Sequence, residues 1–123
     1  MTRRLFALIP AFIPTLFGQP RLTEAQEDAI GKLKAAFIED LQHILFESND
    51  AETRKRAAEM AKRRIVPYIK SGCFISGFIV CDETNNTPET IRNGEFTMSV
   101  NLEYKPGKYV HFRVCIVPED TNA

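Results

Sequence analysis

The hydrophobic pattern of this chain changes its period once, near Gly72, and that change constrains the fold. Before Gly72, apolar residues recur every three or four positions, which is the spacing of amphipathic helices. After it, apolar and polar residues largely alternate, as in strands with one buried face. Helices followed by strands predict an α+β fold. With 123 residues, the chain is expected to form a single domain spanning residues 1–123 with one modest core.

The first helical pattern covers residues 5–16, with Gly18 as a stop signal. Pro10 and Pro14 lie inside it, so a short or kinked helix is expected. Two arginines precede this apolar run, as in a signal peptide. The prolines interrupt the run and no small-x-small cleavage site follows, so we expect a folded or docking segment instead.

A stronger helix is predicted to begin after Thr23, with Gln26 as its capping-box partner, and to end near Phe46. Its apolar residues form one stripe in steps of three and four: Ile30, Leu33, Phe37, Leu41 and Ile44. Residues 1–46 are therefore assigned to N-terminal helices.

Residues 47–72 are predicted to form a basic amphipathic helix that begins at Asn49 or Asp50 and ends at Gly72. At about 100° per residue, the face opposite its apolar side collects positive charge. That basic face consists of Lys55, Arg56, Lys62, Arg63 and Lys70.

Residues 73–123 are assigned to a small sheet. Residues 74–82 are almost continuously apolar, which predicts a central strand covered on both faces. Residues 96–104 alternate between apolar and polar, so one face of that strand should be buried. Pro106 and Gly107 predict a turn, after which residues 109–117 return as the second arm of a hairpin. The complete expectation is two to three N-terminal helices packed on a small mixed or antiparallel sheet ending in a hairpin.

A polar loop between two predicted strands is the strongest candidate for a site. Asp82 and Glu83 are adjacent carboxylates at a strand end, where catalytic acids occur. No nucleophile paired with a base is nearby, however, and Asp, Asn and Thr side chains commonly bond to their own loop backbone. We therefore predict a structural connector, with Asn93 and Gly94 at positive φ. Its proposed structural residues are Asp82, Asn85, Asn86, Thr87, Pro88, Asn93 and Gly94.

Metal and cofactor chemistry are not indicated by the sequence. His43 and His111 have no matched ligand nearby, and the three cysteines form no C-x-x-C or Cys/His cluster. We predict that the protein is not an enzyme and that it uses no cofactor or metal.

The charge balance narrows the range of partners. Sixteen basic residues match sixteen acidic ones, so no global field favours nucleic acid or a membrane, and neither is predicted as a partner. The one aromatic residue of the basic helix, Tyr68, lies on its apolar side, which disfavours base stacking. An acidic protein surface is the better match for Lys55, Arg56, Lys62 and Arg63, although a merely solvated face is the alternative.

Several segments of the chain resemble the C-terminal domain of contractile phage tail sheath proteins. The most specific are residues 81–91 (CDETNNTPETI) and 93–96 (NGEF). Residues 46–50 (FESND) resemble the start of a helix in that family, with Ser48 where proline is usual. Lys105-Pro106 resembles the end of the family's second strand, and residues 3–6 (RRLF) resemble the start of its first helix.

The resemblance implies a structural role. Sheath subunits stack in six-fold rings around a tube, and extended arms from neighbours add strands to this domain. It implies a virion protein of a contractile tail, assembled in the host cytoplasm, with sheath subunits, the tube protein and baseplate or neck proteins as partners, in a homo-hexameric ring. Lys55, Arg56, Lys62 and Arg63 become candidates for contact with the tube.

The chain also departs from the family. Sheath proteins are usually several times longer, and the arm expected before the first helix is reduced here to Met1 and Thr2. This favours a component that nucleates or joins the sheath at the baseplate or neck end. The alternatives are a minimal or truncated main sheath subunit, and a non-viral protein-interaction module with the same fold.

Overall fold

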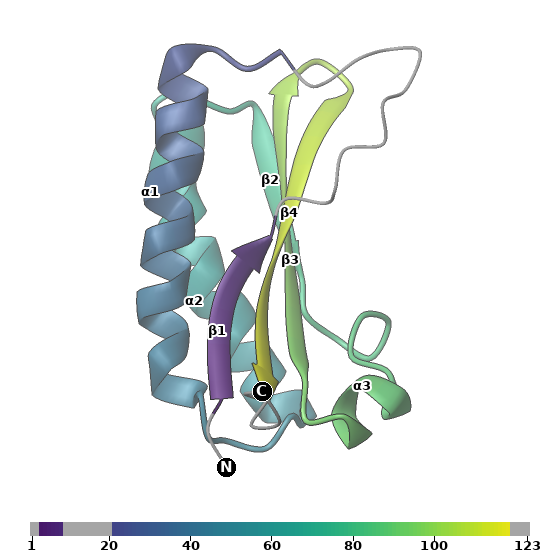
Figure 1. Ribbon diagram of the computed structural model, residues 1–123. Coiled ribbons are helices and arrows are strands. Elements are labelled where there is room, and N and C mark those ends of the chain that lie inside the picture. The colour runs from purple at the N-terminus through teal and green to yellow at the C-terminus, as the bar shows by residue number, and fades with distance from the viewer. Residues whose placement is uncertain (1–2, 9–20, 119–123) are drawn as a thin grey trace.

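The computed structural model describes residues 3–8 and 21–118 and shows two layers, with two long helices on one face of an antiparallel sheet (Figure 1). This confirms the predicted α+β fold with N-terminal helices and a C-terminal hairpin. The described elements in chain order are β1 (Arg3–Leu8), α1 (Glu24–Leu41), the 3-10 helix η1 (Gln42–Ile44), α2 (Ala51–Lys70), β2 (Ser76–Val80), α3 (Pro88–Arg92), β3 (Phe96–Lys105) and β4 (Lys108–Pro118).

The described strands form one sheet in the order β1-β4-β3-β2, and every neighbouring pair is antiparallel. β3 and β4 form the predicted hairpin, in which Lys105 pairs with Lys108 across the turn. Gly107 has a φ of 74°, as the turn chemistry predicts. The long hairpin supplies the two central strands, while β1 and β2 form the edges.

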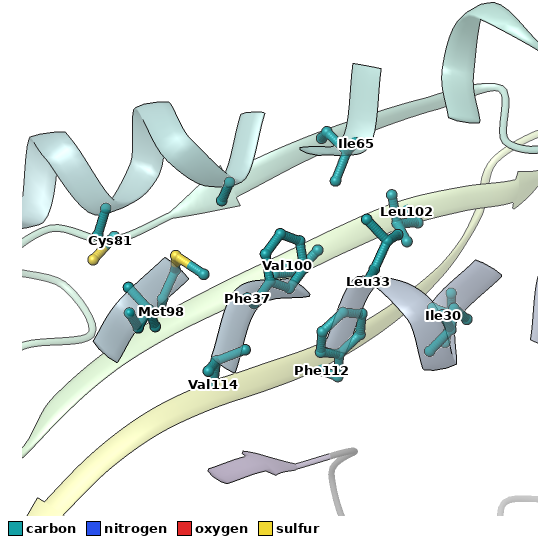
Figure 2. Close-up of a cluster of buried hydrophobic side chains, with 14 of the residues drawn as sticks. Ile30, Leu33, Phe37, Ile65, Cys81, Met98, Val100, Leu102, Phe112 and Val114 are labelled. Carbon is teal, nitrogen blue, oxygen red and sulfur yellow. The ribbon is translucent and has the colours of Figure 1, made fainter. Parts of the chain in front are cut away.

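The core lies between the hairpin and the helices (Figure 2). Alternate residues of β3 and β4 point toward the helices and are buried, as the alternating sequence predicts. Phe37 of α1 meets Phe112 of β4 with ring centroids 6.0 Å apart. Burial of each such side chain stabilises the fold by about 1.5–3 kcal/mol. The remaining large contributors, all fully buried, are Leu33, Leu41, Phe74, Met98, Val100, Leu102, Val114 and Ile116.

The start of α1 is the predicted capping box. The Thr23 side chain accepts from the Gln26 backbone N–H at 3.1 Å, and the Thr23 N–H donates to Gln26 Oε1 at 3.0 Å. The Gln26 amide nitrogen also donates to the carbonyls of Cys73 and Tyr104. One side chain therefore caps the helix and fastens it to the sheet.

Gly77 of β2 lies where α2 approaches the sheet closely. A Cβ atom at this position would stand 3.0 Å from Leu102 Cδ2, 3.1 Å from the Asn101 carbonyl and 3.1 Å from Ile65 Cδ1. Such distances are shorter than ordinary contacts between a Cβ and its neighbours. The absence of a side chain lets Ile65 of α2 pack directly on the edge strand.

The prediction of a first helix is wrong where the structure describes it. Residues 3–8 form strand β1, which pairs with β4 in a register from Arg3 opposite Pro118 to Leu8 opposite Arg113. The likeness of residues 3–6 to the start of a sheath helix fails for the same reason. Hydrogen bonds to β4 satisfy this backbone, and helical spacing of apolar residues cannot reveal such a distant partner. The rest of the predicted helix lies outside the described residues.

The prediction of a central strand over residues 74–82 is also wrong. The strand is shorter, Ser76–Val80, and it is an edge strand that pairs with β3 alone among the described strands. Phe78 is 50% exposed, so the continuous apolar run does not reflect burial on both faces. The long hairpin and β1 occupy the other positions in the sheet, which leaves β2 at its margin.

Candidate functional site

The polar loop after β2 is held by bonds to its own backbone at its first turn. The Asp82 carboxylate accepts from the backbone N–H and the hydroxyl of Thr84. The Asn85 side chain accepts from the Asp82 N–H at 3.0 Å and donates to the Val80 carbonyl at 2.7 Å. Asn85 therefore ties the loop to the last residue of β2, which fixes the direction in which the chain leaves the sheet.

Asn86 is the buried centre of the loop, with 1% of its surface exposed. Its amide nitrogen donates to the carbonyls of Asp82, at 3.1 Å, and Thr97, at 2.8 Å. Its oxygen accepts from the Thr97 N–H at 2.8 Å, so it bonds to the β3 backbone much as a neighbouring strand would. The asparagine amide suits this place because it supplies two donors and an acceptor on one short side chain.

Asn49, just before α2, and Arg54, within it, complete the hydrogen bonds around Asn86. The Asn49 amide nitrogen donates to Asn86 Oδ1 at 3.0 Å and to the Glu95 carbonyl at 2.9 Å. Arg54 is only 8% exposed, and its guanidinium donates to both oxygens of Asn49. Sequence reasoning treated Asn49 only as an alternative helix cap and did not select Arg54. We name this set the asparagine network: Asn49, Arg54, Asn85 and Asn86.

A short helix in the second half of the loop was missed in the sequence. The Thr87 hydroxyl accepts from the Thr90 N–H at 3.2 Å, and Pro88 occupies the first helical position of α3. A Thr-Pro pair is a known start signal that could have revealed it. At the other end Gly94 has a φ of 72°, as predicted, whereas the prediction of positive φ at Asn93 is wrong, since its φ is an ordinary −78°.

The predicted partner-binding residues Lys55, Arg56, Lys62 and Arg63 are all exposed on α2. Arg56 already donates to Glu47 at 2.7 Å, and this hydrogen bond raises the pKa of the Arg56 guanidinium. The other three make no ion pair with any described residue. One helix thus presents three cations that form no ion pair with described residues, which is the arrangement an acidic partner could use.

Arg64 shows how a neighbouring cation is used within the fold. Its guanidinium donates to both carboxylate oxygens of Asp40, at 2.9 and 2.7 Å, and so joins α2 to α1. A shallow hollow beside this pair is lined by Asp40, His43, Met60, Arg63 and Arg64. Arg64 and Arg56 therefore belong to the structure of the helical layer, while Arg63 stays available at its rim.

The candidates for catalysis do not converge. Hydrogen bonds from the Thr84 side chain and backbone lower the pKa of the Asp82 carboxyl, which suits an anion that caps a turn. Burial raises the pKa of the Cys81 thiol to about 12. His43 and His111 are exposed on η1 and β4. Residues 3–8 and 21–118 contain no group of three or more His, Cys, Asp or Glu side chains placed to hold a metal ion.

The face of the sheet away from the helices carries an exposed aromatic pair. Phe78 of β2 and Tyr109 of β4 lie edge to face with ring centroids 5.8 Å apart. Phe78 is 50% exposed and Tyr109 is 43% exposed. Ile75, just before β2, is 52% exposed. Apolar surface therefore gathers beside the outer edge of β2, where no described strand pairs with it.

Comparisons of the chain with protein-family models, with curated proteins and with solved structures find no match. Within the described part of the chain, no helix is both long enough and apolar enough to cross a membrane.

Proposed function

We propose that the protein is a structural component of a contractile phage tail, a sheath-like subunit that joins or nucleates the sheath. It would assemble with neighbouring subunits by sharing strands across sheet edges, and its α2 cations would face the acidic inner tube. In this role the protein acts by geometry and association and needs no catalytic group.

The observation that carries the proposal is the loop from Cys81 to Glu95. The sequence of this loop is the most specific part of the likeness to sheath proteins. The loop is a rigid connector whose buried Asn86 bonds to the backbone of Asp82 and Thr97 and to the side chain of Asn49. A loop of this kind supports a role in which the sheet must keep its shape while other chains bind to it.

Two further features support the same role. β2 has no described strand on its outer side, so the sheet has an edge at which an extended segment can add. Lys55, Lys62 and Arg63 project from α2 without ion pairs among the described residues. An acidic surface would supply the missing counter-charges and would steer the approach of the subunit.

Electron microscopy of purified contractile tails from cells that make this protein tests the proposal. We expect density for the chain in rings with six-fold symmetry at an end of the sheath. Density along the whole shaft would instead favour a main sheath subunit. Absence of the protein from purified tails would contradict the proposal and favour an interaction module outside the virion.

A further inference from the structure

The outer edge of β2 lacks the usual protection of an edge strand. Its sequence, Ser-Gly-Phe-Ile-Val, contains no charged residue and no proline. Natural edge strands commonly carry such residues because they discourage pairing with another chain. The strand at the other edge, β1, includes Arg3 and Arg4 in its sequence. β2 is therefore the edge of the sheet that is open to pairing.

Apolar side chains flank this open edge. Phe78 lies at the middle of β2 and projects from the face away from the helices, as does its register partner Asn101. About half of its surface is in contact with solvent, and the same holds for Ile75 just before the strand. A second strand beside β2 would cover the outer side of Phe78 and pair with backbone groups that no described strand reaches.

The two ends of β2 differ in charge. At its start, Lys70, Lys105 and Lys108 are exposed and make no ion pair with described residues. The acid at that end, Glu103, is already engaged, since it accepts from the Ser76 hydroxyl at 2.7 Å and from the Gly107 N–H at 2.8 Å. The start of the strand is therefore a basic end.

At its other end, β2 runs directly into two acids. Asp82 and Glu83 are both exposed and follow Val80 within three residues. Neither forms an ion pair with a described residue. The start of the strand thus has three exposed lysines nearby, and two exposed acids follow its end directly. One exposed cation, Arg113 of β4, also lies across the sheet at that end, opposite Ser99. The net polarity favours a partner of opposite direction.

We propose that two copies of this chain pair through their β2 edges in antiparallel orientation about a two-fold axis. That orientation sets the acidic end of each β2 beside the basic end of the other, whereas parallel pairing would bring like charges together. A symmetric interface uses the same patch on both copies, so no second surface is needed. The two sheets become one continuous sheet.

The register follows from the symmetry. When residues Ser76–Val80 of the two copies overlap fully, Phe78 faces Phe78 of the second copy at the axis. Ser76 then faces Val80 of the second copy. All three side chains lie on the open face. The pairing therefore places the two Phe78 side chains next to each other at the axis, each with its ring beside the Tyr109 that it already contacts. This pairing is argued from features of the isolated chain and not from the proposed tail function. It uses the same outer edge of β2 at which an extended segment would add, so each occupant excludes the other.

Sedimentation equilibrium of the purified protein tests the pairing directly. We expect a monomer–dimer equilibrium, and Phe78→Lys should raise the dimer dissociation constant by about tenfold or more, since it removes apolar contact and places like charges at the axis. Phe46→Lys is the matched control, because Phe46 is 72% exposed but lies outside β2, and its equilibrium should be unchanged. A monomer at all concentrations, or equal effects of both variants, would overturn the proposal.

Cysteine cross-linking tests the register without relying on stability. In a Cys73→Ser background, Phe78→Cys should form a dimer on oxidation, because residues opposite each other in antiparallel strands have Cα atoms about 4.5–5.5 Å apart. Val80→Cys alone should not, since its two copies would lie about 13 Å apart along the strands. Ser76→Cys combined with Val80→Cys should cross-link again. Equal cross-linking at every position would overturn the assigned register and with it the two-fold pairing.

Discussion

The amide nitrogen of Asn49 donates a hydrogen bond to the side-chain oxygen of Asn86 at 3.0 Å, across 37 positions of the chain. Asn49 stands at the start of the second helix, and Asn86 is buried in the loop that follows the edge strand. The bond joins the helical layer to the sheet through side chains that are polar and satisfied. Because Arg54 holds Asn49 in turn, the position of the loop depends on both layers.

Replacement of Asn86 by aspartate should destabilise the fold by roughly 3 kcal/mol or more, because a buried carboxylate would face the carbonyls of Asp82 and Thr97. The free energy of unfolding in urea measures this. Asn101→Asp is the matched control on the open face of β3, and it should change stability by less than about 0.5 kcal/mol. Equal losses in the two variants would show that the asparagine network does not hold the loop.

Gly94→Ala should cost about 1–2 kcal/mol, since φ at this position is 72° and L residues with a Cβ are strained there. Thermal and urea unfolding should report the same loss. Gly31→Ala is the opposite control, because Gly31 lies inside α1 and a Cβ added there would meet no atom within 4 Å. It should stabilise the helix by about 0.5–1 kcal/mol. A neutral result at Gly94 would contradict the assigned backbone conformation.

Acid should destabilise the protein through carboxylates that cap backbone amides. Hydrogen bonds from Thr53 lower the pKa of Asp50, those from Thr84 lower that of Asp82, and the Gly107 N–H lowers that of Glu103. A depressed folded pKa gives stability that is complete above the unfolded pKa, about 4, and is lost as the pH falls through the folded value. Urea midpoints measured from pH 7 to pH 2 should therefore fall below about pH 4.

Asp82→Asn isolates one contribution to this acid sensitivity. The asparagine oxygen can still accept from Thr84, but it does not titrate, so the fall in stability below about pH 4 should become shallower. Glu83→Gln is the control, because the Glu83 carboxylate forms no hydrogen bond with described residues, and its acid profile should match the wild type. Identical profiles for Asp82→Asn and the wild type would contradict the assignment.

Reversal of charge at Lys62 and Arg63 should weaken attachment to purified tail tubes by about tenfold at low salt, and the difference should shrink as salt screens the contact. Co-sedimentation with tubes measures this. Arg92→Glu is the control, since Arg92 is exposed on α3 and away from α2. Unchanged attachment of the double variant would mean that the basic face is only solvated.

The elements that were predicted correctly are those whose signals are local. Thr23 and Gln26 define the start of α1 within four residues, and Pro106 and Gly107 define the hairpin turn. The alternation in β3 likewise reports its buried face directly. Each of these follows from contacts between near neighbours or from one exposed and one buried side of an element.

The elements that were missed depend on distant partners. Residues 3–8 are a strand only because β4 is beside them, and β2 is an edge only because of the strand order. The hydrogen bonds within the loop could be predicted from Asp82 and Thr87. The bond from Asn49 to Asn86 could not, because the two residues lie 37 positions apart. Arg54 contacts Asn49 and so supports the loop only indirectly. No spacing rule contains that information.

The absent side chain of Gly77 has a mechanical consequence. Because Ile65 packs on this residue, α2 lies closer to β2 than an ordinary contact with a Cβ atom at position 77 would allow. The cations of α2 and the open edge of β2 are the two surfaces through which partners are proposed to bind, and both are mounted on this pair of elements. A side chain at position 77 would require Ile65, Leu102 or the β3 backbone to move by a few tenths of an ångström, so the missing carbon atom helps to set the distance between the two surfaces.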